Sequence, residues 1–117
     1  MRNTGPDMDT VMAVLHRDGY RCIRDGVPIQ GERGLDWVLH HRRPRAMGGT
    51  RRADANSPAN LVSLCAPCHG HIESHREEAT ARGFNVPQGV DPRYVPINLA
   101  TYGWVLLDDE GFHHASE

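Results

Sequence analysis

The stretch "HHRRPRAMGGT" (40–50), followed by "NLVSLCAPCH" (60–69), decides the fold that we expect for this chain. The first stretch ends an apolar segment, "LDWVLHH" (35–41), which predicts a strand, and "NLVSL" (60–64) predicts a second short strand. A long loop joins the two strands. A structureless loop of this length in a compact domain is usually functional or disordered.

Further elements are expected on both sides of these strands. A helix over about 69–82 follows "CAPC" (65–68) and ends at Gly83. "GWVLLDDEGFHHA" (103–115) predicts a hairpin that turns at Glu110-Gly111. An N-terminal helix is indicated by apolar residues at i, i+3, i+4 and i+7, which are Met8, Val11, Met12 and Leu15. Asp7 is its expected N-cap, and Gly19 is expected to end it. The predicted fold class is therefore α+β.

Two adjacent histidines, His40 and His41, end the first predicted strand. Neighbouring residues on a strand point to opposite faces, so these two side chains cannot do the same job. One can face the helix and hold a metal while the other faces a water molecule. An unperturbed histidine has a pKa of about 6.5 and is therefore partly neutral, and competent as a base, at physiological pH.

The order of polar residues along this segment resembles that of the HNH endonucleases, whose core is a two-stranded hairpin and a helix around one divalent metal (the ββα-metal fold). The flanks "VLHRDGYRC" and "GWVLLDDEG" are similar to those of small HNH proteins of tailed phages of actinobacteria, so the resemblance covers roughly residues 10–112. The core residues that carry it are His40-His41, Pro44, Gly48-Gly49, Asn60 and His69.

The resemblance implies a role for each matching residue. His40 and His69 would hold the metal, and His41 would be the general base. Asn60 would orient His41. A helix residue four positions after His69 shares its face, which makes Glu73 the preferred third ligand and leaves His75 in reserve. Mg²⁺, Mn²⁺, Ni²⁺ and Zn²⁺ all suit a mixed histidine and carboxylate site, so the catalytic metal stays open.

Three cysteines are too few for a disulfide framework and suggest reduced thiols. Many HNH proteins carry a structural zinc site made of two C-x-x-C pairs. Cys65 and Cys68 match one pair, but the other has Cys22 with Asp25 where a second cysteine is expected. Zinc accepts a carboxylate oxygen, so the four residues could still close a tetrahedral site. The alternative is three buried thiols without a metal.

The net charge of −2 argues against a nucleic-acid partner, but the distribution of charged residues along the chain does not. Residues 1–52 hold ten arginines and six acids, whereas residues 53–117 hold three arginines and nine acids, and the chain has no lysine. Arginine forks pair bidentately with phosphate. Five arginines of the long loop are therefore expected to contact a DNA backbone rather than only to solvate the loop: Arg42, Arg43, Arg45, Arg51 and Arg52.

Length and hydropathy set limits on the organisation. With 117 residues, we expect one domain over 1–117, with its core motif at about 35–83. The longest apolar run, Val11 to Leu15, is far shorter than the ~20 residues of a membrane span, and no secretory signal is evident. We therefore expect a cytoplasmic protein, in the host cytoplasm if a phage encodes it, with no membrane partner. Trp37 and Trp104 are expected in the core, and His113-His114 in a tail.

The sequence thus predicts a metal-dependent endonuclease that hydrolyses DNA phosphodiester bonds, by nicking or by double-strand cleavage. By resemblance, it would work beside phage terminase subunits during genome packaging. Two alternatives stay open. One is a non-catalytic zinc-containing module that binds DNA or assists packaging, and the other is an HNH nuclease of the homing or restriction type.

Overall fold

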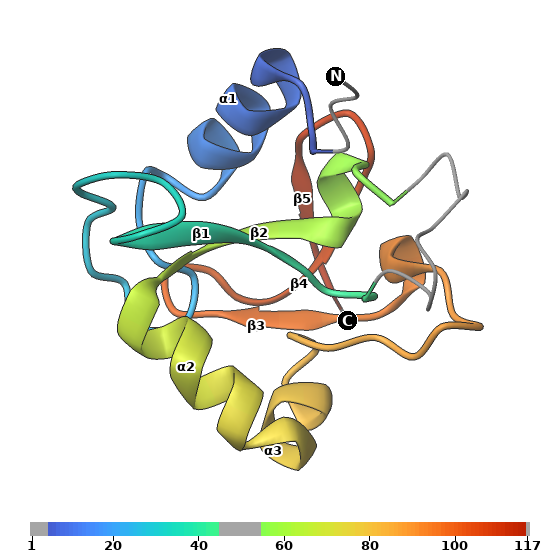
Figure 1. Cartoon of the computed structure of the whole chain (residues 1–117). Helices are drawn as coiled ribbons and strands as arrows, with labels where there is room; N and C mark the ends of the chain where they lie inside the picture. Colours follow the sequence, from blue (N-terminus) through green and yellow to red (C-terminus); the bar gives the residue numbers. More distant parts are fainter. Residues whose placement is uncertain (1–4, 45–54, 117) are drawn as a thin grey trace.

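A two-stranded antiparallel hairpin lies at the centre of the computed structural model, which describes residues 5–44 and 55–116. Strand β1 (Trp37–His41) pairs with β2 (Leu61–Cys65), so that His41 lies opposite Leu61 (Figure 1). Helix α2 (Ala66–Ser74) follows β2 directly. Both strands were predicted, with boundaries shifted by one or two residues, and the fold is a small mixed α+β structure as expected.

Helix α1 (Met8–Arg17) covers one side of the hairpin. The predicted N-cap is confirmed, because the Asp7 side chain accepts a 2.8 Å hydrogen bond from the Thr10 N–H. The predicted apolar face was only partly right. Val11, Val14 and Leu15 are buried against Trp37, Leu39 and Leu61, whereas Met8 and Met12 are exposed.

A buried ion pair joins the end of α1 to β2. The guanidinium of Arg17 lies 2.8 Å from the Asp18 carboxylate, and both side chains are fully buried. Arg17 also donates to the carbonyls of Pro58 and Leu61, and Asp18 accepts from the Ser63 N–H and hydroxyl. These bonds satisfy the two buried charges and fix the position of β2 relative to α1.

The predicted helix over 69–82 is two shorter helices. Helix α2 begins earlier, at Ala66, and the chain leaves helical geometry at His75, where φ is −129° and ψ is 64°. Helix α3 (Arg76–Ala81) then ends just before Gly83. Gly83 has a φ of +81°, and a Cβ there would overlap the Pro96 carbonyl, so a side chain is excluded on two grounds.

A three-stranded sheet in the order β3-β4-β5 packs under the hairpin (Figure 1). The predicted C-terminal hairpin is confirmed as β4 (Gly103–Leu107) and β5 (His113–Ala115), whereas β3 (Ile97–Leu99) was not predicted. His113 and His114 therefore belong to a strand rather than a tail. Short 3₁₀ turns precede β2 and β3: η1 (Pro58–Asn60) and η2 (Pro92–Tyr94).

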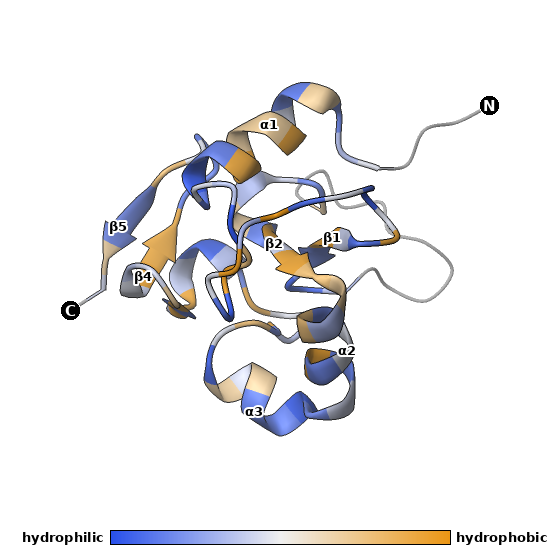
Figure 2. Cartoon of the chain, turned by 90° about the vertical axis from the view of Figure 1, so that its left-hand side faces the viewer, coloured by the Kyte–Doolittle hydropathy of each residue, from blue (hydrophilic) through white to orange (hydrophobic). Residues whose placement is uncertain are grey.

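The main core lies between β2, α2 and the three-stranded sheet. Its most deeply buried side chains include Val62, Leu64, Ile72, Phe84 and Ile97. In Figure 2 the orange of hydrophobic residues is seen on β2 and β4. Trp37 is buried as predicted, but Trp104 is 47% exposed because it lies on the outward face of β4. Within the described ranges, no helix has the length and apolar character that crossing a bilayer requires.

Candidate functional site

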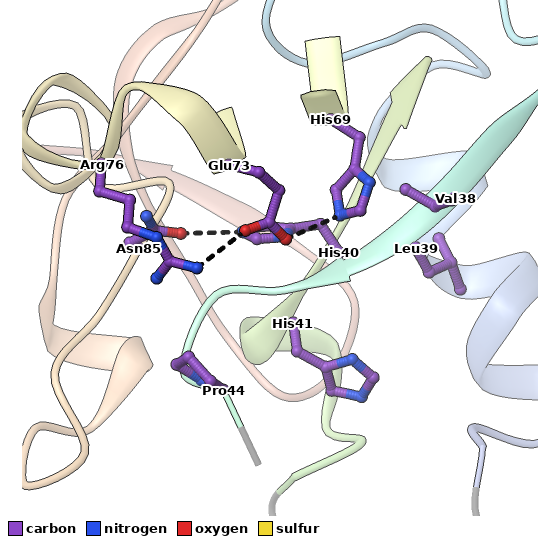
Figure 3. A pocket seen from close by; sticks show the side chains of 9 residues that line it. All are labelled: Val38, Leu39, His40, His41, Pro44, His69, Glu73, Arg76 and Asn85. Carbon is purple, nitrogen blue, oxygen red and sulfur yellow. Dashed lines mark hydrogen bonds and ion pairs between the residues drawn. The ribbon is translucent and has the colours of Figure 1, made fainter. Parts of the chain in front are cut away.

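A pocket of ≈ 490 Å³ lies where β1 faces the last turns of α2 (Figure 3). The histidines selected from the sequence line it together with charged side chains from α2 and α3. Its lining residues are Val38, Leu39, His40, His41, Pro44, His69, Glu73, Arg76 and Asn85. Four of the predicted catalytic or metal-binding residues thus meet at one cavity: His40 and His41 from β1, and His69 and Glu73 from α2.

His40 and His41 point to opposite sides of β1, as the strand geometry requires (Figure 3). The His40 ring faces α2, where its centroid lies 5.7 Å from that of His69, and only 8% of the residue is exposed. Burial lowers the pKa of His40 below its usual value, which favours the neutral ring. His41 is half-buried on the other side.

Glu73 is a carboxylate that lies beside His69. Its Oε1 lies 3.4 Å from His69 Nε2, and its Oε2 lies 3.0 Å from an Arg76 guanidinium nitrogen. His75, the reserve ligand, is stacked on His71 instead, with ring centroids 4.0 Å apart, and it does not line the pocket. Of the two candidates for a third ligand, Glu73 therefore shares a pocket with His40 and His69.

Asn60 has a different place from the one predicted. It is 1% exposed, its Oδ1 accepts from the Arg43 N–H at 2.7 Å, and its Nδ2 donates to the carbonyls of Arg43 and Ala55. The side-chain amide of Asn60 thereby links Arg43 and Ala55, which lie near the two ends of the long loop. The residue that bonds His41 is Asn56, whose Oδ1 lies 2.8 Å from His41 Nε2.

Arg42 was predicted to contact DNA, but the structure places its side chain in the interior. Its side chain is fully buried and donates to four backbone carbonyls, those of Ala59, Gly83, Pro92 and Val95. Burial and the nearby Arg17 charge lower its pKa to about 9, which still leaves it charged at neutral pH. Because its guanidinium is bonded to these carbonyls, Arg42 stabilises the fold and cannot also bind a phosphate.

The other predicted DNA-binding arginines divide into two groups. Arg43 is 5% exposed, and its Nη1 donates to the Val90 carbonyl at 2.9 Å, which also makes it part of the interior. Arg45, Arg51 and Arg52 lie outside the described residues. Arg76, which the sequence analysis did not select, is an exposed cation at the pocket, with 70% of its side chain accessible.

The cysteines form a second site at the N-terminal end of α2. Cys22, Asp25, Cys65 and Cys68 each offer a ligand atom, and these atoms all lie within 4.8 Å of one another. No other set of three or more metal-ligating residues in ranges 5–44 and 55–116 meets this distance, so the histidine pocket is the looser of the two sites. The four residues predicted as ligands of a structural metal such as zinc therefore lie close together in the structure.

Local backbone geometry explains why Asp25 can take the place of a cysteine. Residues 22–27 form a tight turn in which the Gly26 N–H bonds to the Cys22 carbonyl and Gly26 has a φ of +77°. This turn brings Asp25 Oδ2 to 3.2 Å from Cys68 Sγ and 3.5 Å from Cys65 Sγ. Cys65 ends β2 and Cys68 lies in the first turn of α2, so a metal bound here would fix the helix that carries His69.

The protonation states at this site follow from burial and hydrogen bonding. Burial raises the pKa of the Cys22 and Cys68 thiols. Burial also disfavours the charged Asp25 carboxylate, but hydrogen bonds from the Val27 N–H and the three thiols hold its pKa below the usual value. Arg24 adds a positive charge, with its Nη1 lying 3.3 Å from Cys68 Sγ. Without metal, Cys22 and Cys68 therefore stay protonated beside the Asp25 carboxylate.

Comparisons with family models, curated proteins and solved structures found no match. Sequence reasoning missed Asn56, Arg76 and Asn85. Asn56 and Arg76 lie within a few residues of Asn60 and Glu73, whereas Asn85 reaches the pocket from beyond α3 and gave no local signal.

Proposed function

We propose that this chain is a metal-dependent endonuclease of the HNH type that hydrolyses DNA phosphodiester bonds. The observation that carries the proposal is the placement of two adjacent histidines on opposite sides of β1, with His69 and Glu73 facing the first of them across one pocket. The order β1, β2, α2 supports the resemblance seen in the sequence.

His41 is the general base in this proposal. The Asn56 oxygen accepts a hydrogen bond, so His41 Nε2 carries the proton and Nδ1 has the lone pair. Nδ1 can then take a proton from a water molecule that attacks phosphorus. Asn56 does for His41 what the resemblance had assigned to Asn60.

His40, His69 and Glu73 are the groups that would hold a divalent cation. Two imidazoles and a carboxylate suit Mg²⁺, Mn²⁺, Ni²⁺ or Zn²⁺. Such an ion supplies charge stabilisation for the scissile phosphate and the leaving oxygen. Glu73 now bonds Arg76, so ligation by Glu73 would release the Arg76 guanidinium toward a phosphate.

The cysteine site favours a second candidate, a non-catalytic zinc-containing module that binds DNA or assists packaging. Its four ligand atoms lie closer together than those of the histidine pocket. In the preferred proposal the same site holds a structural zinc. Work beside a phage terminase, or cleavage of the homing or restriction type, extends the nuclease proposal by resemblance alone.

Plasmid cleavage tests the enzyme against the binding module. Supercoiled DNA is incubated with wild type, His41→Ala and His75→Ala in Mg²⁺, Mn²⁺, Ni²⁺ or Zn²⁺. Wild type and His75→Ala are expected to convert the plasmid to open or linear forms, whereas His41→Ala is at least about 100-fold slower. Wild type that binds the plasmid and leaves it intact in every metal supports the binding module and refutes the nuclease.

A further inference from the structure

His40 Nε2 is aimed at two oxygen atoms that do not belong to the predicted site. It lies 2.9 Å from the Phe84 backbone carbonyl oxygen and 3.1 Å from Asn85 Oδ1. A carbonyl oxygen can only accept a hydrogen bond, so the nitrogen facing it must be the donor. A neutral imidazole has one N–H, which leaves the lone pair on Nδ1.

The segment that supplies these oxygens is held firmly against the hairpin. The Val86 N–H donates to the Arg42 carbonyl at 2.8 Å, and Arg42 Nε donates to the Gly83 carbonyl at 2.9 Å. The Phe84 side chain is 1% exposed in the main core. The acceptor at Phe84 is therefore a fixed part of the backbone and not an adjustable side chain.

Burial makes the choice of tautomer costly to reverse. His40 is 8% exposed, so water has little access to replace a lost partner. The Nδ1–H tautomer would place an unprotonated Nε2 against two oxygens, and the buried carbonyl of Phe84 would lose its donor. Both effects disfavour that tautomer.

We propose that the Phe84 carbonyl and the Asn85 side chain are positioning groups, which hold His40 as the Nε2–H tautomer and leave Nδ1 as its metal-binding nitrogen. The tautomer follows from the contacts of the metal-free chain. The metal-binding part rests on the proposed function. His40, a strand residue of the core motif, would thus be oriented for metal binding by a segment that follows α3 in the sequence.

The tautomer can be measured without metal or DNA. Long-range ¹H–¹⁵N spectra of the metal-free protein are recorded near pH ~8.5, about two units above the ordinary histidine pKa. His40→Gln assigns the His40 signals by difference. We expect Nε2 in the protonated range and Nδ1 in the unprotonated range. The reverse pattern overturns the inference, even if the protein cleaves DNA.

The contribution of Asn85 is tested by calorimetric titration with Mn²⁺, which prefers oxygen and nitrogen ligands and competes little for thiols. Asn85→Leu should bind Mn²⁺ about tenfold more weakly than wild type, whereas Asn85→Asp, which keeps an acceptor, should bind at least as well. Asn98→Leu is the control, since Asn98 is equally half-buried on β3, away from the pocket.

Equal Mn²⁺ affinity of Asn85→Leu and wild type overturns the role of Asn85, and so does an equal loss in Asn85→Leu and Asn98→Leu. If Asn85→Leu does not fold, Asn85→Asp and the wild-type spectrum decide, because a loss of affinity in Asn85→Asp contradicts the proposal. A protein with the expected tautomer and Mn²⁺ affinities that leaves DNA intact retains this inference and loses the proposed function.

Discussion

Asn60 and Asn56 lie four residues apart, yet their side chains face different groups. Asn60 makes three hydrogen bonds to buried backbone, whereas Asn56 bonds His41. Asn60→Ala should therefore lower the free energy of unfolding by about 2–3 kcal/mol, because the buried Arg43 N–H loses its acceptor. Urea unfolding of purified protein measures this loss.

Asn56→Ala should have the opposite profile. We expect its free energy of unfolding to stay within about 0.5–1 kcal/mol of wild type, since the bonded groups are half-buried. Plasmid cleavage should slow by about tenfold or more, because His41 loses the partner that fixes its tautomer. Normal cleavage by Asn56→Ala together with slow cleavage by a folded Asn60→Ala would return the orienting role to Asn60.

Arg76 has the exposure that Arg42 lacks, and it lies at the pocket. Arg76→Gln removes a phosphate-binding charge while leaving a polar side chain, so affinity for duplex DNA should fall about three- to tenfold and its salt dependence should become shallower. Fluorescence anisotropy at several salt concentrations measures both. Arg82→Gln is the control, an exposed arginine on the same segment that does not line the pocket. Equal losses in the two variants would indicate a general charge effect.

The cysteine site joins the turn at 22–27 to the start of α2. We expect about one zinc per chain in protein purified without chelator. Asp25→Ala should retain much less zinc after dialysis, and Asp25→Cys should retain at least as much as wild type. Elemental analysis measures the content, with Asp9→Ala as an exposed control. Full zinc retention by Asp25→Ala would exclude the carboxylate as a ligand.

The raised thiol pKa values give this site a pH dependence with a definite sign. In metal-free protein, Cys22 and Cys68 stay protonated at a pH where unfolded thiols, with a pKa near 9.0, already ionise. Their contribution to stability is therefore present below pH 9.0 and is lost as the pH rises above it. Zinc binding displaces the thiol protons, so zinc affinity should instead increase with pH. Unfolding curves with and without chelator compare the two trends, and a metal-free protein that gains stability above pH 9.0 would contradict them.

The sequence predicted elements wherever a local signal was present. Asp7 capped α1 as expected, and Gly111 allowed the turn between β4 and β5, where its φ is +91°. The break at His75, where φ is −129° and ψ is 64°, was missed because "REEATA" (76–81) continues with good helix formers. β3 was missed because three residues after a proline carry too little pattern. The contacts of Asn85 and Asn56 depend on segments brought together only by folding.

Arg42 belongs to a run of charged residues in the sequence, but its side chain lies in the interior of the molecule. Its neighbours suggested a solvated, DNA-facing loop, but its guanidinium enters the interior and donates to four carbonyls from three separate segments. The planar fork of arginine can reach several acceptors at once, which lysine cannot. These bonds hold η1, η2 and the turn after α3 around the end of β1, and thereby set the segment that bonds His40.

Arg42→Met should therefore lower the free energy of unfolding by about 3 kcal/mol or more, since several buried carbonyls lose their donor at once. Arg42→Lys should fall between Arg42→Met and wild type, because one ammonium replaces only part of the fork. Arg33→Met, at an exposed position, should stay within about 0.5 kcal/mol of wild type. Urea unfolding ranks the four proteins, and Arg42→Lys gives the answer if Arg42→Met does not fold. An Arg42→Met protein as stable as Arg33→Met, but with weaker DNA binding, would place the guanidinium at the surface and restore the original interpretation of the loop.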